Sequence, residues 1–152
     1  MEILDDDQIV QGLVLFFDDD YRLLGTEFRK FDDSKRLVED KIILSKEQFN
    51  ELLVIPLLAN VIAVTAAFGN TTRAYDILDK TLQTILDDFF TKEDRDKFGD
   101  LFIARNAEYS KIEIMDVPGS VRFGKCFCNH FFNKIEDGRH IDFIFFIRGL
   151  LN

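Results

Sequence analysis

The chain has few of the residues on which small secreted proteins and many enzymes depend. Among its 152 residues there is no tryptophan, and there are only two cysteines, two prolines and two histidines. Two cysteines are too few for the disulfide framework of a small secreted domain, and the opening residues MEILDDDQ lack the basic-then-apolar order of a signal peptide. The sequence therefore predicts a cytoplasmic protein.

Positive charge is also scarce. The 19 Lys and Arg residues face 28 Asp and Glu residues, which gives a formal net charge of −9. Nucleic-acid phosphates and anionic membranes attract clusters of basic residues, so we expect neither direct nucleic-acid binding nor membrane docking. The acids occur in short runs typical of solvated turns, which would also suit an inhibitor or immunity-type protein that blocks a partner's basic surface. These runs are Asp5–Asp7, Asp18–Asp20, Asp32–Asp33 and Asp87–Asp88.

No sequence motif for catalysis or for a cofactor is present. The chain has no G-x-S-x-G nucleophile motif, no Walker loop and no G-x-G-x-x-G. The run Asp18–Asp20 lacks the spaced ligands and the glycine of an EF-hand loop. An enzyme that uses pocket carboxylates stays open, but the sequence favours a non-catalytic protein and identifies neither catalytic nor ligand-binding residues.

What the chain has instead is apolar and aromatic bulk. Apolar residues make up 47% of it, and 17 residues are Phe, which fills a core without needing a hydrogen-bond partner. We expect one domain over residues 1–152, in which residues 1–44 could form an N-terminal hairpin extension. The uncharged stretch 52–72 has an apolar part, 52–68, that contains Pro56 and is at the lower edge of membrane-spanning length. We interpret it as buried core.

The N-terminal pattern predicts strands followed by helices. Residues 9–17 and 21–31 flank an acidic turn and predict an antiparallel hairpin, with 37–44 as another strand. The S-x-x-Q pattern at Ser45 predicts that a helix starts there. Two interpretations of the next residues stay open. One is a single helix that ends before Gly69, which we favour slightly, and the other is a short helix followed by a hairpin that turns at residues 59–60.

The later pattern predicts two helices and then a sheet. Apolar residues repeat at three and four between 72 and 90, and Thr91 with Asp94 resembles the start of a helix that ends near residue 106. Alternation then predicts strands, so the expected fold is α+β, with an antiparallel sheet packed against a helical cluster. The expected elements are a strand at 109–117, a type II turn at 117–120, a strand at 120–132, a hairpin turn at Asp137–Gly138 and a final strand at 140–151.

Three segments in order resemble the PAS family of sensory domains. They are TKEDRDKF at 91–98, DVPGSVRF at 116–123 and EDGRHIDFIFFIRG at 136–149. The resemblance implies a regulatory or signalling module that acts in trans, binds a small ligand or a protein partner, and is able to form a homodimer. It implies neither flavin nor haem, because no cysteine or histidine occurs on the predicted middle and late helices. The cofactor, if there is one, stays unknown.

A weak metal motif follows in the predicted strand. Cys126, Cys128 and His130 form C-x-C-x-H, and on a strand the three side chains would share one face. His140, across the predicted turn, would be a fourth ligand. Alternate side chains on a strand are roughly 7 Å apart, which is wide for ligands around one zinc ion. The sequence therefore favours two buried thiols and a surface imidazole over a metal site.

Overall fold

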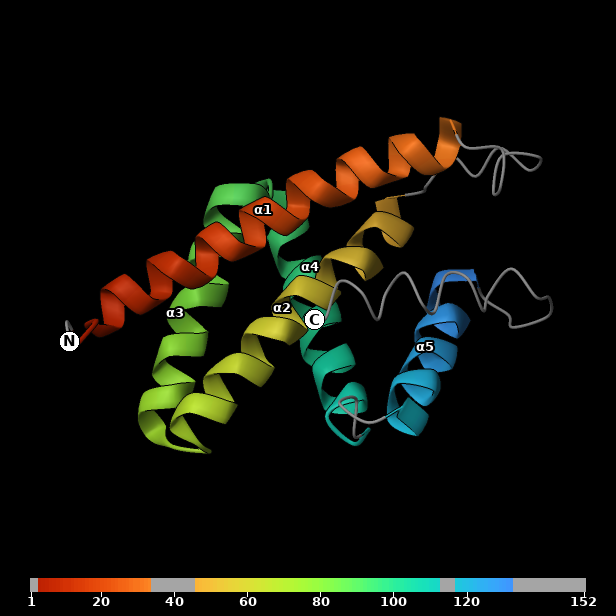
Figure 1. Ribbon diagram of the computed structural model, residues 1–152. Helices are drawn as coiled ribbons and strands as arrows, with labels where there is room; N and C mark the ends of the chain where they lie inside the picture. The colour runs from red at the N-terminus through yellow and green to blue at the C-terminus, as the bar shows by residue number, and fades with distance from the viewer. Residues whose placement is uncertain (1–2, 34–45, 113–116, 133–152) are drawn as a thin grey trace.

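The computed structural model describes residues 3–33, 46–112 and 117–132, and those residues form five α-helices (Figure 1). None of the three ranges contains a strand, so the predicted α+β sheet is wrong and the described chain is all-α. The helices are α1 (Asp6–Asp33), α2 (Lys46–Phe68), α3 (Thr72–Phe89), α4 (Lys92–Tyr109) and α5 (Val117–Phe132).

Helix α2 is the centre of the core. It packs against each of the other four helices, and all its residues from Glu51 to Leu58 are buried. A helix that is apolar on every side is stable only when other elements surround it, which explains this central position. The interpretation of one long helix is confirmed, because burial outweighs the strand preference of β-branched residues such as Val54 and Ile55.

The length and composition of α2 would also let it cross a membrane. It is the one helix of this kind within the described ranges, and 56% of its most apolar window is buried inside the protein. Core helices of soluble proteins share these properties, so the helix decides nothing about location. The cytoplasmic assignment stays a prediction.

The turn between α2 and α3 matches the signals in the sequence. Gly69 has φ +69°, a left-handed conformation that glycine adopts without strain, and its N–H donates to the Thr65 carbonyl at 2.9 Å. Thr71 then caps α3, because its hydroxyl accepts from the Ala74 N–H at 3.2 Å. The helix predicted at 72–90 is therefore confirmed.

Helix α1 replaces the hairpin predicted at residues 9–31. It runs across α3 and α2 (Figure 1), and Val10 and Phe17 are buried while Val14 and Tyr21 pack at the edge of the core. These positions are spaced by four, three and four residues, which is a helical period. The acidic run does not form a turn, because Asp18 instead pairs with Arg22 one helical turn later, at 3.0 Å.

Helix α5 overturns the predicted turn at 117–120 and the strand at 120–132. Pro118 lies in its first turn, where a missing N–H costs nothing, and Phe123, Phe127 and Phe131 are buried at intervals of four. The resemblance to PAS domains is therefore wrong, because that family needs a sheet here. The predicted strand at 37–44, the hairpin at Asp137–Gly138 and the strand at 140–151 lie outside the described residues.

Helix α4 confirms the helix predicted after Thr91. The Thr91 hydroxyl lies 2.9 Å from the Asp94 carboxylate, and Phe98 and Phe102 are buried as their spacing predicts. The helix extends three residues beyond the predicted end, to Tyr109. Those extra residues include Glu108 and Tyr109, which belong to the candidate sites described next.

Candidate functional site

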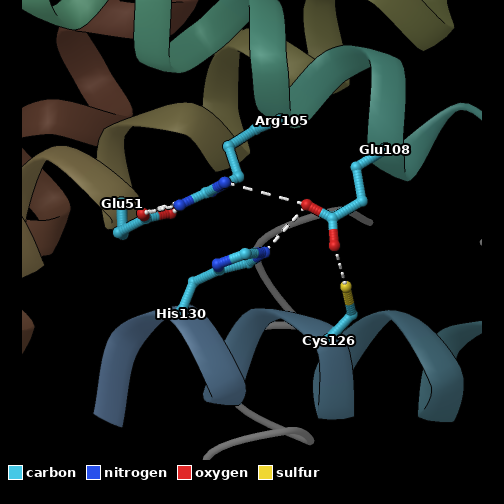
Figure 2. Close-up of polar contacts among 5 residues, drawn as sticks. All are labelled: Glu51, Arg105, Glu108, Cys126 and His130. Atoms are coloured by element: carbon cyan, nitrogen blue, oxygen red, sulfur yellow. Dashed lines mark hydrogen bonds and ion pairs between the residues drawn. The ribbon is translucent and has the colours of Figure 1, made fainter. Parts of the chain in front are cut away.

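A polar network joins the C-terminal half of α4 to α2 and α5 (Figure 2). Arg105 on α4 donates twice to the Glu51 carboxylate on α2, from Nε to Oε2 at 2.9 Å and from Nη2 to Oε1 at 2.6 Å. Glu51 is only 6% exposed among apolar neighbours. An unpaired carboxylate would be costly there, so the paired guanidinium is what makes this burial tolerable. The hydrogen bonds that Arg105 donates to Glu51 in turn raise the pKa of Arg105.

Glu108 connects this ion pair to α5. Its Oε2 lies 2.8 Å from His130 Nε2 and 3.7 Å from Arg105 Nη1, and its Oε1 accepts a hydrogen bond from Cys126 Sγ at 2.9 Å (Figure 2). Cys126 and His130 are four residues apart on one helix, so their side chains point to the same side. One carboxylate thus meets a thiol, an imidazole and a guanidinium.

The protonation states of this network follow from its geometry. Burial alone would raise the pKa of Glu108, but hydrogen bonds from Cys126 and His130, with the nearby charges of His130 and Arg105, lower it below its ordinary value. Burial, followed by the hydrogen bond to Glu108 and the charge of that carboxylate, raises the pKa of Cys126 to about 12. At neutral pH the network therefore holds an ionised Glu108 and a protonated thiol.

The predicted metal-ligand set is only partly brought together. Cys126 and His130 meet at Glu108, whereas Cys128 is fully buried in the core, where burial raises its pKa to about 11. The physical reason is the period, because residues two apart point apart on a helix but together on a strand. His140 lies outside the described residues. Glu108 was missed, since only the tertiary structure places it beside α5.

A large cavity lies beside α4. It has a volume of about 1170 Å³, is partly open to solvent and is lined by the C-terminal halves of α2 and α4 and by α3. Its lining is mostly apolar, and it includes Leu58, Val61, Leu82 and Phe102. A cavity of this kind is the most common form of a small-molecule site in proteins.

Two polar groups at this cavity have no hydrogen-bond partner within the described part of the chain. They are the Tyr109 hydroxyl and Asn106 Oδ1, and both residues line the cavity. Tyr109 is fully buried, and its ring packs edge-on against Phe123 of α5 with centroids 4.7 Å apart. Burial raises the pKa of Tyr109, so its hydroxyl is protonated and is able both to donate and to accept.

Five aspartates at the surface are paired with bases of the same chain. The pairs are Asp6 with Arg73, Asp7 with Lys80, Asp18 with Arg22, Asp87 with Arg95 and Asp94 with Lys46. Pairs at the surface stabilise little, but they reduce the negative charge that α1, α3 and α4 present to a partner.

The comparisons with known proteins give no relatives. No family model matches the chain, and no curated protein or solved structure matches it significantly. The proposals below therefore depend on the chemistry of the described residues alone.

Proposed function

We propose that the protein is a binding module for a small, neutral, mainly apolar molecule that carries one hydroxyl or amide group, and that the cavity between α2, α3 and α4 holds it. The observation that carries the proposal is a pair of polar groups without a partner among the described residues, the Tyr109 hydroxyl and Asn106 Oδ1, whose residues belong to a mainly apolar lining.

The energetic reason is the cost of leaving such groups without a partner. A buried polar atom without a hydrogen bond costs about 1–3 kcal/mol. Both atoms are themselves buried, so a ligand would reach them only with a small side-chain movement. A ligand hydroxyl would then donate to Asn106 Oδ1 and exchange a hydrogen bond with Tyr109, which would remove this cost at both atoms. Binding sites commonly combine an apolar wall with a few polar groups that orient the ligand.

The charge of the site favours a neutral ligand over a carboxylate. Asp79 lines the cavity, and the whole chain carries a net charge of −9. A negatively charged head group would be repelled by both. No cationic side chain lines the cavity within the described residues, so nothing there would pair with an anion.

The size and the rim of the cavity suit an apolar ligand. Its volume of about 1170 Å³ is slightly larger than the roughly 300–1,000 Å³ of most ligand pockets, so it has room for a mainly apolar molecule of ordinary size. Tyr75 and Ile103 belong to its lining and remain 54% and 62% exposed. Large apolar side chains that stay exposed at a cavity indicate contact with another molecule.

The test is calorimetric titration of the purified full chain with three probes of equal chain length: 1-decanol, decane and decanoate. We expect the alcohol to bind most tightly and the carboxylate most weakly. We also expect Tyr109→Phe to weaken alcohol binding about tenfold, the value of one hydrogen bond, without affecting the alkane. Failure of all three probes to bind would contradict the proposal.

Two variants serve as controls. Tyr21→Phe makes the same chemical change in the aromatic group formed with Phe17, Phe49 and Phe89, away from the cavity lining, and should leave binding unchanged. Ala107→Trp enlarges an exposed residue of the lining and should block binding without unfolding the protein. If Tyr21→Phe weakens binding as much as Tyr109→Phe does, the cavity is not the site.

A protein partner, action in trans and a homodimer stay predictions, as does the alternative of an acidic inhibitor. Adding salt distinguishes the ligand-binding module from the inhibitor. Binding driven by charge weakens as the salt concentration rises, whereas binding driven by apolar burial does not. Decanol affinity that is unchanged by added salt would support the ligand-binding module. Salt-sensitive capture of a basic protein, with no affinity for decanol, would support the inhibitor.

A further inference from the structure

We propose that Glu108, Cys126 and His130 form a binding site for a thiophilic divalent metal ion of the zinc class, at the junction of α4 and α5. The three donor atoms lie within 4.8 Å of one another, and they come from two helices, Glu108 from α4 and the other two from α5 (Figure 2). This site is separate from the apolar cavity and does not depend on the proposed ligand.

The spacing of the ligands is one that metal sites use. Cys126 and His130 occupy positions i and i+4 of α5, the same helical spacing with which two histidines of H-E-x-x-H hold zinc. Around a tetrahedral zinc ion, donor atoms would be roughly 3.3–3.6 Å apart, as its bond lengths of 2.0–2.3 Å require. Glu108 contacts Cys126 and His130 through different oxygens, at 2.9 and 2.8 Å, and the three donor atoms lie within 4.8 Å of one another. Side-chain shifts of about 1 Å would bring them to the separations that zinc requires.

The kind of donors selects the kind of metal. A thiolate, an imidazole and a carboxylate together suit zinc, whereas magnesium and calcium prefer oxygen ligands alone. On binding, the Cys126 thiol would release its proton to solvent as the sulfur–metal bond forms. His130 would bind through Nε2 and keep its ring proton on Nδ1. With Glu108 ionised, the ligands carry two negative charges and neutralise the ion.

The surroundings of the three ligands are compatible with a cation. Arg105 is the one base near the site among the described residues, and its charge is matched by the bidentate pair with Glu51. Its Nη1 lies 3.7 Å from Glu108 Oε2, so it is able to orient the ligating carboxylate from outside. Three protein ligands leave one position for water or another ligand, as in zinc sites that are not closed.

The test is titration of the chelator-treated full chain with Co²⁺, which reports coordination by absorption, followed by competition with Zn²⁺. We expect one equivalent of Co²⁺ to produce a thiolate-to-metal charge-transfer band that Zn²⁺ removes. Glu108→Gln and His130→Gln should each weaken Zn²⁺ binding by at least about tenfold. Absence of the band in the unaltered protein would overturn the proposal.

The second cysteine provides the matched control. Cys126→Ser should abolish the charge-transfer band, whereas Cys128→Ala should keep it, because Cys128 is buried in the core away from Glu108. A band that survives in Cys126→Ser, or that disappears in Cys128→Ala while the variant remains folded, would overturn the assignment.

One measurement needs no variant and so does not depend on correct folding of altered chains. Alkylation with iodoacetamide, mapped by peptide mass spectrometry, reports each thiol separately. Added Zn²⁺ should slow the modification of Cys126, which is partly exposed, and leave that of the fully buried Cys128 unchanged. Equal alkylation of Cys126 with and without Zn²⁺ would overturn the proposal.

Discussion

The C-terminal half of α4 carries two pairs of polar residues, one with its buried groups hydrogen-bonded and one without. Toward α5, Arg105 and Glu108 have their hydrogen-bonding groups matched by Glu51, Cys126 and His130. The neighbouring Asn106 and Tyr109 each bury a polar atom without a partner inside the described part of the protein. Arg105 and Tyr109 are four residues apart and lie on nearly the same face of α4, so the contrast comes from what each polar atom contacts.

This difference separates stabilising contacts from candidate binding contacts. A fully paired network holds helices together. Removing one of its side chains leaves the remaining buried groups without hydrogen bonds and so lowers stability. An unpaired group lowers stability, and an ordered water or a bound ligand would each supply the missing partner. The predictions below test this contrast, beginning with the largest expected effect.

Removing the charge of Arg105 should have the largest effect on stability. Arg105→Met leaves the Glu51 carboxylate buried and unpaired, which should lower the free energy of unfolding by about 3 kcal/mol. Urea denaturation at neutral pH measures it. The double variant Glu51→Leu/Arg105→Met should lose less than the single variant, because no charge then stays unpaired. If Arg105→Met changes stability by less than about 1 kcal/mol, the pair does not hold α4 to α2 as described.

Tyr109→Phe should raise the free energy of unfolding, whereas Arg105→Met lowers it. The change removes a buried hydroxyl that lacks a partner among the described residues, and keeps the ring that packs on Phe123. We expect the ligand-free protein to gain about 1 kcal/mol in thermal or urea unfolding. If the free energy of unfolding instead falls by a similar amount, the hydroxyl has a hydrogen-bond partner in solution. The contrast between the paired and unpaired groups of α4 would then be wrong.

Acid should lower the stability of the folded protein, because it protonates Glu108 and weakens the contacts of that carboxylate. Its pKa in the folded protein lies below the ordinary value of 4.5, so its contribution to stability is complete above that value and is lost as pH falls through the lowered pKa. The urea midpoint of the unaltered protein should therefore fall more in acid than that of Glu108→Gln. Parallel pH profiles for the two proteins would contradict the network.

Asp20 of α1 offers an unpaired carboxylate for comparison. Its Oδ2 is buried without a partner within the described residues, and burial, with the charge of Asp19, raises its pKa above 3.8. The folded state therefore holds this proton more tightly, and stability falls as pH rises through the raised pKa. Asp20→Asn should be slightly more stable than the unaltered protein at neutral pH, and equal to it below pH 3.8. The exposed change Asp88→Asn, as a control, should have no effect at either pH.

The helices that the sequence predicted correctly are those with clear start and stop signals. Gly69, Thr71 and Thr91 mark ends that the structure reproduces, and the apolar stripe of α3 has an unambiguous period. Helices α1 and α5 were assigned as strands because their apolar residues partly alternate and because Asp18–Asp20 and residues 117–120 look like turns. Tertiary packing outweighs these local signals, since each helix buries aromatic side chains at helical spacing.

The candidate site was predictable only in part. Cys126 and His130 were identified by residue type, but on a strand their natural third partner was Cys128. A helix instead selects the pair four residues apart and turns Cys128 into the core. Glu108 is 18 residues away from Cys126 in the chain, and no spacing rule connects them.

The sequence by itself determined the apolar α2 core, the caps of α3 and α4 and the excess of acid, because these depend on composition and on contacts between near neighbours. Only the tertiary structure decided that α1 and α5 are helices, that Glu51 meets Arg105, and that Glu108 meets Cys126 and His130. The reason is that burial and ion pairing depend on which surfaces meet, and these surfaces come from segments distant in the chain.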